Sequence, residues 1–353
     1  MVECCAAVAG GSSNIGVAVA RAGLAGNPSD ALGGAAIAIP IPALAARVEL
    51  RDAERVRVVG PRQEQTWSSM YDLDTEVSRH GHEGADRLVT AALVMLWRWA
   101  TTTRSGRPPG DAGLGTAALG NTTPFEAVWS TDIPRSVGLA GSSALIVATM
   151  RAAAERWELD IDPPMLAGLT LETERTELGL PAGWMDRAVQ AHNAPTWMDA
   201  RTTTQVDGLD LPIMEVVTPA PIELAIAWDP VGAAPSRRLH GGLQARLKAG
   251  DPAMPAAIGR LVEQAELATA ALIGGDGPAL RAAVSASCEL RRELGALDER
   301  TSALVEHARR SGSAATSAGS GGAVSVVPGP AGLQAALDVF AEAGLPTATV
   351  RFG

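Results

Sequence analysis

A glycine-rich stretch at 134–144, Pro-Arg-Ser-Val-Gly-Leu-Ala-Gly-Ser-Ser-Ala, strongly limits what this chain can fold into. The residues that follow it are good helix formers, so the stretch predicts a loop that leads into a helix N-terminus. The first amides of a helix lack internal partners and carry partial positive charge, which favours a bound anion. Gly138 and Gly141 would let the backbone approach a phosphate. Ser142 and Ser143 could cap the helix or offer a hydroxyl to magnesium.

The loop is not the common P-loop, which ends in Gly-Lys-Ser/Thr. Here serines follow Gly141, and Lys248 is the only lysine in the chain. A glycine-rich loop by itself is also typical of a purely structural turn. The preceding segment, 124–131, predicts a strand, and the order strand, glycine loop, helix is the context that phosphate binding requires.

Three ordered motifs resemble those of the GHMP kinases, the family of galactokinase, homoserine kinase, mevalonate kinase and phosphomevalonate kinase. The stretch 134–144 is similar to the second family motif, with Gly141 as one extra residue before the serine pair. Residues 20–30 resemble the first motif, and 318–323 resemble the third, although the third lacks the usual Lys and Thr. Within the family, all three stretches are most similar to plant-type glucuronokinases.

This resemblance implies an α+β, two-domain GHMP kinase fold. We expect a ribosomal protein S5 domain 2-like N-terminal domain over 17–215 and a ferredoxin-like α/β sandwich over 216–353. Single cores stop growing at about 250–300 residues, so a chain of 353 residues suits two domains. Residues 1–16 are expected to be a leader that could lack ordered structure. Strands are predicted at 35–41 and 46–59 from their apolar patterns.

A helix predicted between Asp162 and Gly179 carries two acidic residues that could hold a metal ion. Counting about 100° per residue places Glu177 on the apolar face and Glu174 at its edge. A solvated helix end is the alternative interpretation. The next segment, 178–187, resembles the part of the family that carries the catalytic Asp.

The resemblance implies a role for residues of all three motifs. Asp186 would accept the proton of the attacking hydroxyl and contact the substrate, with Arg21 beside it. Glu174 and Ser143 would bind Mg²⁺. The nucleotide would lie on Pro134, Gly138, Leu139, Ala140, Gly141, Ser142, Ser143 and Ala144. The substrate would lie on Asn27, Asp30, Gly319, Ser320 and Gly321.

We therefore expect an ATP- and Mg²⁺-dependent kinase that phosphorylates the anomeric hydroxyl of D-glucuronate or a similar sugar. A GHMP kinase for another sugar or cyclitol and a non-catalytic sugar sensor on the same fold are alternatives. A dehydrogenase that uses 10–16 as a dinucleotide loop is disfavoured, because no adequate strand precedes that segment.

The sequence alone does not assign a role to two groups of side chains, one of arginines and one of tryptophans. A uronic acid needs a cation for its carboxylate, for which Arg187, Arg291 and Arg292 are unranked candidates. Trp97 and Trp99 could form an adenine pocket, although packing in the core is the commoner role of such side chains.

Composition narrows the possible partners and the compartment. The net charge of −10 argues against nucleic acid or an anionic membrane as the main partner. Cys4, Cys5 and Cys288 form no paired framework, which favours a reducing cytoplasm. The apolar run at 17–41 is broken by charges, prolines and glycines, so neither a signal peptide nor a membrane span is predicted. We expect a cytoplasmic monomer or homodimer that acts on a small molecule.

Overall fold

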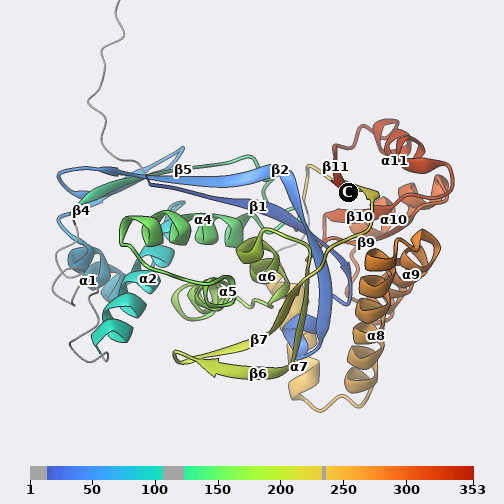
Figure 1. The fold of residues 1–353 in the computed structure, drawn as a ribbon, viewed down its shortest axis with the longest axis horizontal. Helices are drawn as coiled ribbons and strands as arrows, with labels where there is room; N and C mark the ends of the chain where they lie inside the picture. Colours follow the sequence, from blue (N-terminus) through green and yellow to red (C-terminus); the bar gives the residue numbers. More distant parts are fainter. Residues whose placement is uncertain (1–13, 106–122, 233–235) are drawn as a thin grey trace, which may run out of the picture.

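The computed structural model describes residues 14–105, 123–232 and 236–353 (Figure 1). The expected leader lies outside the described residues up to position 13, as does most of the 10–16 segment. In the described part, two antiparallel-rich sheets and the helices packed on them form the molecule. This arrangement confirms the predicted α+β, two-domain fold class.

The larger sheet holds seven of the described strands, in the order β4-β3-β5-β2-β6-β7 with β1 paired to β2. All its pairs are antiparallel except β3 with β5. Its strands are β1 (Asn14–Ala25), β2 (Ala35–Asp52), β3 (Val56–Val59), β4 (Glu64–Trp67), β5 (Phe125–Thr131), β6 (Thr196–Val206) and β7 (Leu209–Val216).

The prediction of separate strands at 35–41 and 46–59 is wrong, because β2 continues through the gap between them. Pro40 and Pro42 have no N–H to donate, and such residues are tolerated at bulges. The pairing with β1 accordingly skips from Ala45 opposite Val19 to Ile41 opposite Ala20. The long strand then ends at Asp52, and a short turn leads to β3.

Helices cover one face of this sheet, below β1 and β2 in Figure 1. α4 (Gly141–Arg156) packs on β1 and β2, next to α2 (Arg87–Ser105) and α6 (Met185–His192). Ten of the sixteen residues of α4 are buried, so this helix is held in the core. Its fixed position also fixes the glycine loop before it. The layer is completed by α1 (Met70–His80) and α5 (Pro163–Glu172).

The smaller sheet has the order β11-β8-β10-β9 and is antiparallel throughout. Its strands are β8 (Ile222–Trp228), β9 (Ala314–Ser317), β10 (Ala323–Val327) and β11 (Thr347–Phe352). The helices of this part are α7 (Ser236–Lys248), α8 (Ala253–Gly274), α9 (Gly277–Glu293), α10 (Glu299–Arg310) and α11 (Gly332–Ala341). The chain passes from one sheet to the other between Val216 and Ile222. A domain boundary at 215/216 stays a prediction.

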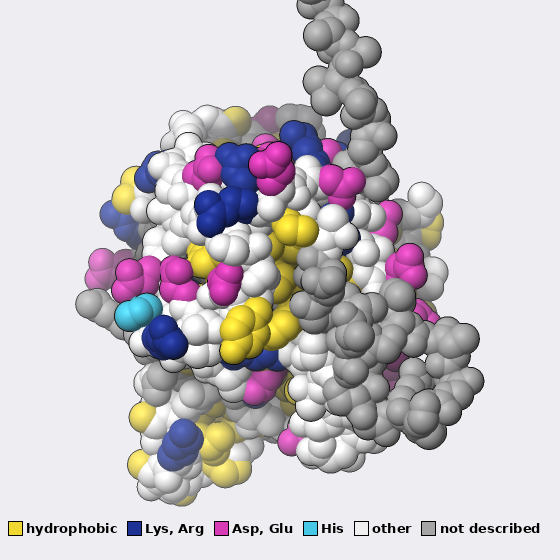
Figure 2. Space-filling view, turned by 90° about the vertical axis from the view of Figure 1, so that its left-hand side faces the viewer, with side chains coloured by type: hydrophobic (Ala, Val, Ile, Leu, Met, Phe, Trp, Pro, Cys, Tyr) yellow, Lys and Arg dark blue, Asp and Glu magenta, His cyan; other side chains and the backbone are white. Residues whose placement is uncertain are grey.

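The surface shows no field of one charge at the end drawn in Figure 2, where acidic and basic side chains are interspersed. Oppositely charged side chains also pair on the surface, as Arg57 does with Glu64 across β3 and β4. Among the described helices, none combines the length and the apolar character that crossing a membrane demands.

Candidate active site

A cavity of about 770 Å³ lies where the three glycine loops meet. Arg21, on β1, stands at its centre and is 3% exposed. Its Nη1 donates to the carbonyl oxygen of Gly138 at 2.7 Å and to that of Ala318 at 2.9 Å. One buried guanidinium from the first motif therefore joins the second and third motifs.

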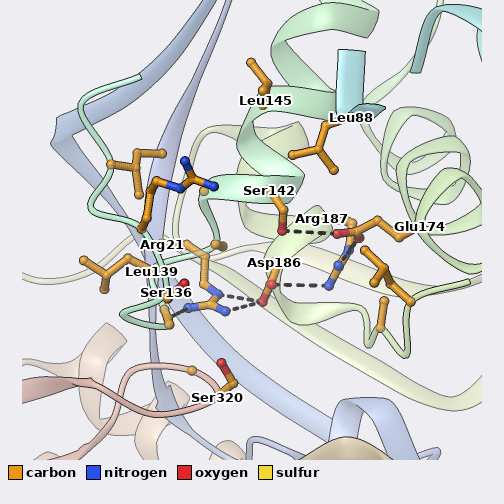
Figure 3. A pocket seen from close by; sticks show the side chains of 18 of the residues that line it. Arg21, Leu88, Ser136, Leu139, Ser142, Leu145, Glu174, Asp186, Arg187 and Ser320 are labelled. Atoms are coloured by element: carbon orange, nitrogen blue, oxygen red, sulfur yellow. Dashed lines mark hydrogen bonds and ion pairs between the residues drawn. The ribbon is translucent and has the colours of Figure 1, made fainter. Parts of the chain in front are cut away.

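Asp186 lies in the first turn of α6 and accepts hydrogen bonds from Arg21 (Figure 3). Arg21 Nε and Nη2 are each 2.6 Å from its Oδ1. On the other side, Arg187 Nη1 is 3.3 Å from Oδ2, which is the less tightly held oxygen. The side chain keeps 19% exposure and lines the cavity. The structure thus places Arg21 and Asp186 together, as the resemblance implied.

Glu174 lies in a π-helical turn, Thr173–Glu177, that continues α5. The turn is wider than an α-helix, with the N–H of Leu178 donating to the carbonyl of Thr173. Counting 100° per residue therefore gave the wrong order of burial for Glu174 and Glu177. Glu174 is 1% exposed, whereas Glu177 points away to His82 and Arg98, at 3.0 and 2.7 Å.

Arg187 is the partner of Glu174 in a buried ion pair. Both Nε and Nη2 of Arg187 donate to Glu174 Oε2, and Nη1 donates to the carbonyl of Gly183. Burial, together with the nearby charge of Arg21, lowers the pKa of Arg187 to about 9, so the group is still protonated at neutral pH. Arg187 is therefore committed to protein groups and is not free for a substrate carboxylate.

The two serines of the second motif face different surroundings. The N-cap of α4 is Ala140, in a left-handed conformation with φ 62° and no side-chain cap, so the prediction that a serine caps this helix is wrong. Ser143 is buried, and its Oγ donates back to the carbonyl of Ala140 at 3.2 Å. Ser142 Oγ instead lies 3.5 Å from Glu174 Oε1. The serine next to Glu174 is thus Ser142, in place of the predicted Ser143.

The pair of Ser142 Oγ and Glu174 Oε1 suits a magnesium ion that is shared with a phosphate ligand. Mg²⁺ usually takes only one or two protein carboxylates and completes its six positions with water and phosphate oxygens. No group of three or more His, Cys, Asp or Glu side chains among the described residues could hold a metal alone. The donor set fits a metal that arrives with a nucleotide.

The glycine loops contribute mostly backbone to the cavity. From the second motif, the residues that line it are Pro134, Gly138, Leu139, Ala140, Gly141 and Ser142. Ser143 and Ala144, also predicted to bind nucleotide, are buried behind this surface. From the third motif, Gly319 and Ser320 line the cavity, whereas Gly321 supports the loop. A Cβ on Gly138, whose φ is +75°, would lie 2.5 Å from the Gly321 carbonyl oxygen.

Asn27 and Asp30, for which a role in substrate binding is predicted, both line the cavity. Asp30, in the 3₁₀ helix Ser29–Leu32, is 6% exposed, and its Oδ2 accepts from the Met185 N–H at 3.0 Å. Asp30 is thereby held against the start of α6, next to Asp186. Asn27 Nδ2 donates to the Ser317 carbonyl at 3.2 Å, and its buried Oδ1 has no partner among the described residues.

The apolar end of the cavity was missed from the sequence. It is lined by Pro61, Leu88, Trp129, Ile133 and Leu145. Trp129 ends in a hydrogen bond from Nε1 to Asp86 Oδ1 at 2.7 Å, which fixes the ring. Trp97 and Trp99 pack against the core and do not line the cavity. The one available signal was the position of Trp129 in the strand that enters the phosphate loop.

The cavity is positively charged although the chain is acidic. Six arginines line it, against three acids, Asp30, Glu174 and Asp186. The arginines are Arg21, Arg62, Arg87, Arg135, Arg187 and Arg291. Among them, Arg62, Arg87 and Arg135 are exposed, and their guanidinium groups have no partner among the described residues. Such a cavity favours a polyanionic ligand.

Comparisons with known proteins agree with this arrangement. The GHMP kinases N terminal domain matches residues 111–194. Glucuronokinase 1 of Arabidopsis thaliana is 29% identical over 321 residues, which span 87% of this chain and 83% of that protein.

Solved structures show the same fold at low sequence identity. Phosphomevalonate kinase of Streptococcus pneumoniae, in complex with phosphomevalonate and AMPPNP, has a TM-score of 0.72 at 15% identity, covering 96% of this chain and 99% of that one. Galactokinase of Lactococcus lactis, complexed with galactose, has a TM-score of 0.73 at 16% identity, covering 96% and 93%. By domain match, sequence similarity and fold, this chain is similar to the GHMP kinases and, among them, to the plant glucuronokinases.

Proposed function

We propose that this chain is an ATP- and Mg²⁺-dependent kinase that phosphorylates the anomeric hydroxyl of D-glucuronate or a similar sugar. The observation that carries the proposal is the position of Asp186. Its carboxylate is clamped by Arg21 where all three glycine loops meet, and one oxygen faces a cavity rich in arginine. The similarity to Glucuronokinase 1 supports the choice of sugar.

Phosphoryl transfer requires mainly positioning of two reactants and stabilisation of phosphate charge. The triphosphate would lie on the amides at the start of α4, whose orphan N–H groups favour an anion. Its adenine would enter the apolar end beside Trp129. Exposed arginines at the cavity surface, such as Arg135, would meet the outer phosphate oxygens.

The sugar would lie between Asp30 and Asp186, with Asn27 next to it. Asp186 Oδ2, held only at 3.3 Å by Arg187, would accept the proton of the attacking hydroxyl. Arg21 would keep that carboxylate oriented and add positive charge next to the transferred group. A bound Mg²⁺, held by Glu174 and Ser142, would neutralise charge on the phosphates.

A kinase for another sugar or cyclitol would use the same loops and the same Asp186. A non-catalytic sensor is less well supported, because the carboxylate, its arginine clamp and the oxygen pair at Glu174 and Ser142 are all in place. A sensor needs none of these groups to be arranged around one cavity.

An ADP-release assay with ATP, Mg²⁺ and a panel of acceptors tests the proposal. The panel holds D-glucuronate, D-galacturonate, glucose, galactose, inositol and mevalonate. We expect the highest kcat/KM with D-glucuronate, and loss of turnover with nearly unchanged ATP binding in Asp186→Asn. If a neutral sugar or cyclitol is turned over faster than all others, the chain is a kinase for that substrate. ATP binding without turnover of any acceptor would favour the non-catalytic sensor.

A further inference from the structure

Arg291 is a buried cation at the substrate end of the cavity that forms no ion pair with a described side chain, although Asp30 and Asp298 lie near enough to attract its charge. It projects from α9 and is 1% exposed. Its guanidinium donates only to backbone carbonyls, those of Asn27, Ala296 and Gly319, at 3.0 to 3.1 Å. Two of these carbonyls belong to the first and third motifs, so Arg291 lies directly behind the loops that surround the substrate.

No acidic side chain in the described part of the chain forms an ion pair with Arg291. The other two buried arginines of the cavity differ, since Arg21 pairs with Asp186 and Arg187 pairs with Glu174. Burial lowers the pKa of Arg291 to about 10, which leaves it protonated at neutral pH. A buried, charged group without a counter-ion is unfavourable unless something else supplies the opposite charge.

Arg291 also has donors that the protein leaves unused. Its Nε is buried and has no hydrogen-bond partner among the described residues. Nη1 carries two N–H groups and makes one described bond, to the Asn27 carbonyl. The neighbouring Asn27 Oδ1 is likewise buried and unpartnered. Buried polar atoms are rarely left unsatisfied in native structures, so these point to a ligand with both acceptors and hydroxyls.

We infer that Arg291 binds the carboxylate of a sugar acid and selects acids over neutral sugars. This inference rests on the proposed kinase function and names the residue behind its substrate class. Arg187 is already engaged with Glu174. Arg292 is 40% exposed, pairs with Glu289 and does not line the cavity. Of the three candidate arginines, only Arg291 lines the cavity without forming an ion pair with a described side chain.

The carboxylate, and not a phosphate of the nucleotide, is the anion that suits this position. Arg291 lies against Asn27, at the end of the cavity that holds Asp30. The phosphate-binding amides and the Glu174–Ser142 pair belong to α4 and the π-helical turn. A sugar held by Asp30 and Asn27 would place its C6 carboxylate, and no phosphate, within reach of the guanidinium.

The test compares D-glucuronate with D-glucuronamide, a neutral molecule of nearly the same shape. For the wild type, a charged hydrogen bond predicts that kcat/KM for glucuronate exceeds that for glucuronamide by about 10- to 100-fold. We expect Arg291→Gln to remove most of this ratio and Arg291→Lys, which keeps a cation, to retain part of it. Arg292→Gln, the adjacent exposed arginine, serves as the matched control and should keep the wild-type ratio.

Three outcomes would overturn the inference. An equal kcat/KM of the wild type for both sugars would overturn it without any variant. This comparison therefore tests the inference even if the Arg291 variants fail to fold. An equal loss for both sugars in Arg291→Gln would show a purely structural role. If Arg291→Gln raises only the KM for ATP, the anion at Arg291 is a phosphate of the nucleotide and not the carboxylate of the sugar.

If the proposed kinase function is wrong, the wild type turns over no acceptor at all. The carboxylate site is then tested by measuring the equilibrium binding of D-glucuronate to the wild type and to Arg291→Lys. Binding of D-glucuronate that is tighter than that of D-glucuronamide, and weakened in the variant, would support the site. Equal binding of both sugars would exclude it.

Discussion

Replacing Arg187 by Met would leave the carboxylate of Glu174 buried without its cation. The side chains of the pair are 6% and 2% exposed, so water can replace little of the charge compensation that the guanidinium provides. Removing one partner of a buried ion pair costs about 3–5 kcal/mol of folding free energy. For a domain of about 200 residues, roughly 2–4 °C is lost per kcal/mol, which predicts a Tm lower by about 6–20 °C.

Differential scanning calorimetry of four proteins measures this effect. Arg292→Met is the control, because an exposed ion pair contributes about 0–1 kcal/mol. The double variant Glu174→Gln, Arg187→Met removes both charges, and we expect it to be more stable than Arg187→Met alone. If Arg187→Met unfolds at the temperature of the control, or if the double variant is the least stable of the four, Arg187 does not stabilise the fold through the charge of Glu174.

Three further predictions concern the metal pair, the sugar end and the π-helical turn. Ser142→Ala should raise the Mg²⁺ concentration needed for half-maximal turnover more than Ser143→Ala does, because only the Ser142 hydroxyl lies next to Glu174; the reverse order would restore Ser143 as the ligand. Gly183→Ala would bring a Cβ to 2.3 Å from Asp30 Oδ2, so we expect the KM for the sugar to rise by about tenfold or more with the KM for ATP unchanged, whereas Gly259→Ala, with open space around it, should match the wild type. Burial acts to raise the pKa of Glu177, but its hydrogen bond from His82 and the charge of Arg98 outweigh this and lower it. The stabilisation by the Glu177 carboxylate is therefore present above pH 4.5 and is lost as the pH falls through the lowered pKa, so the Tm difference between wild type and Glu177→Gln should shrink from pH 6 to pH 3; a constant difference would contradict it.

Local sequence signals were sufficient to predict secondary structure where residue types directly favour one backbone conformation. The strand, glycine loop and helix around 134–144 were predicted because glycine, proline and helix-forming residues act on their own neighbours. Asp162 does cap the following helix, accepting from the Met165 N–H at 2.8 Å. The motif resemblance added the contact between Arg21 and Asp186, which are 165 positions apart and which no local pattern could join.

Other features depend on geometry that the sequence does not state. The π-helical turn at Thr173–Glu177 altered which acid is buried, since the count assumed a regular α-helix. In the same way, Ala140 adopts the left-handed conformation and serves as the N-cap, so α4 begins at Gly141. This start places Ser142, and not Ser143, next to Glu174. The stretch 311–322 is rich in serine and glycine, which favours a loop, yet it contains the buried strand β9, whose residues pair with β10.

The charges of the cavity could not be ranked before the fold was known. Arg187, Arg291 and Arg292 look alike in sequence, yet one is paired in the interior, one is buried without a counter-ion and one is exposed. Trp129 was overlooked for a similar reason, since only the packing of β5 against the loop brings its ring to the cavity.

The identity of the phosphorylated product decides whether this chain phosphorylates the anomeric hydroxyl of D-glucuronate. The protein is incubated with ATP, Mg²⁺ and D-glucuronate, and the product is examined by phosphorus NMR with proton coupling. We expect a sugar phosphate whose phosphorus couples to the anomeric proton, and no such product with Asp186→Asn. Release of inorganic phosphate without a sugar phosphate, or a product phosphorylated at another hydroxyl, would contradict it.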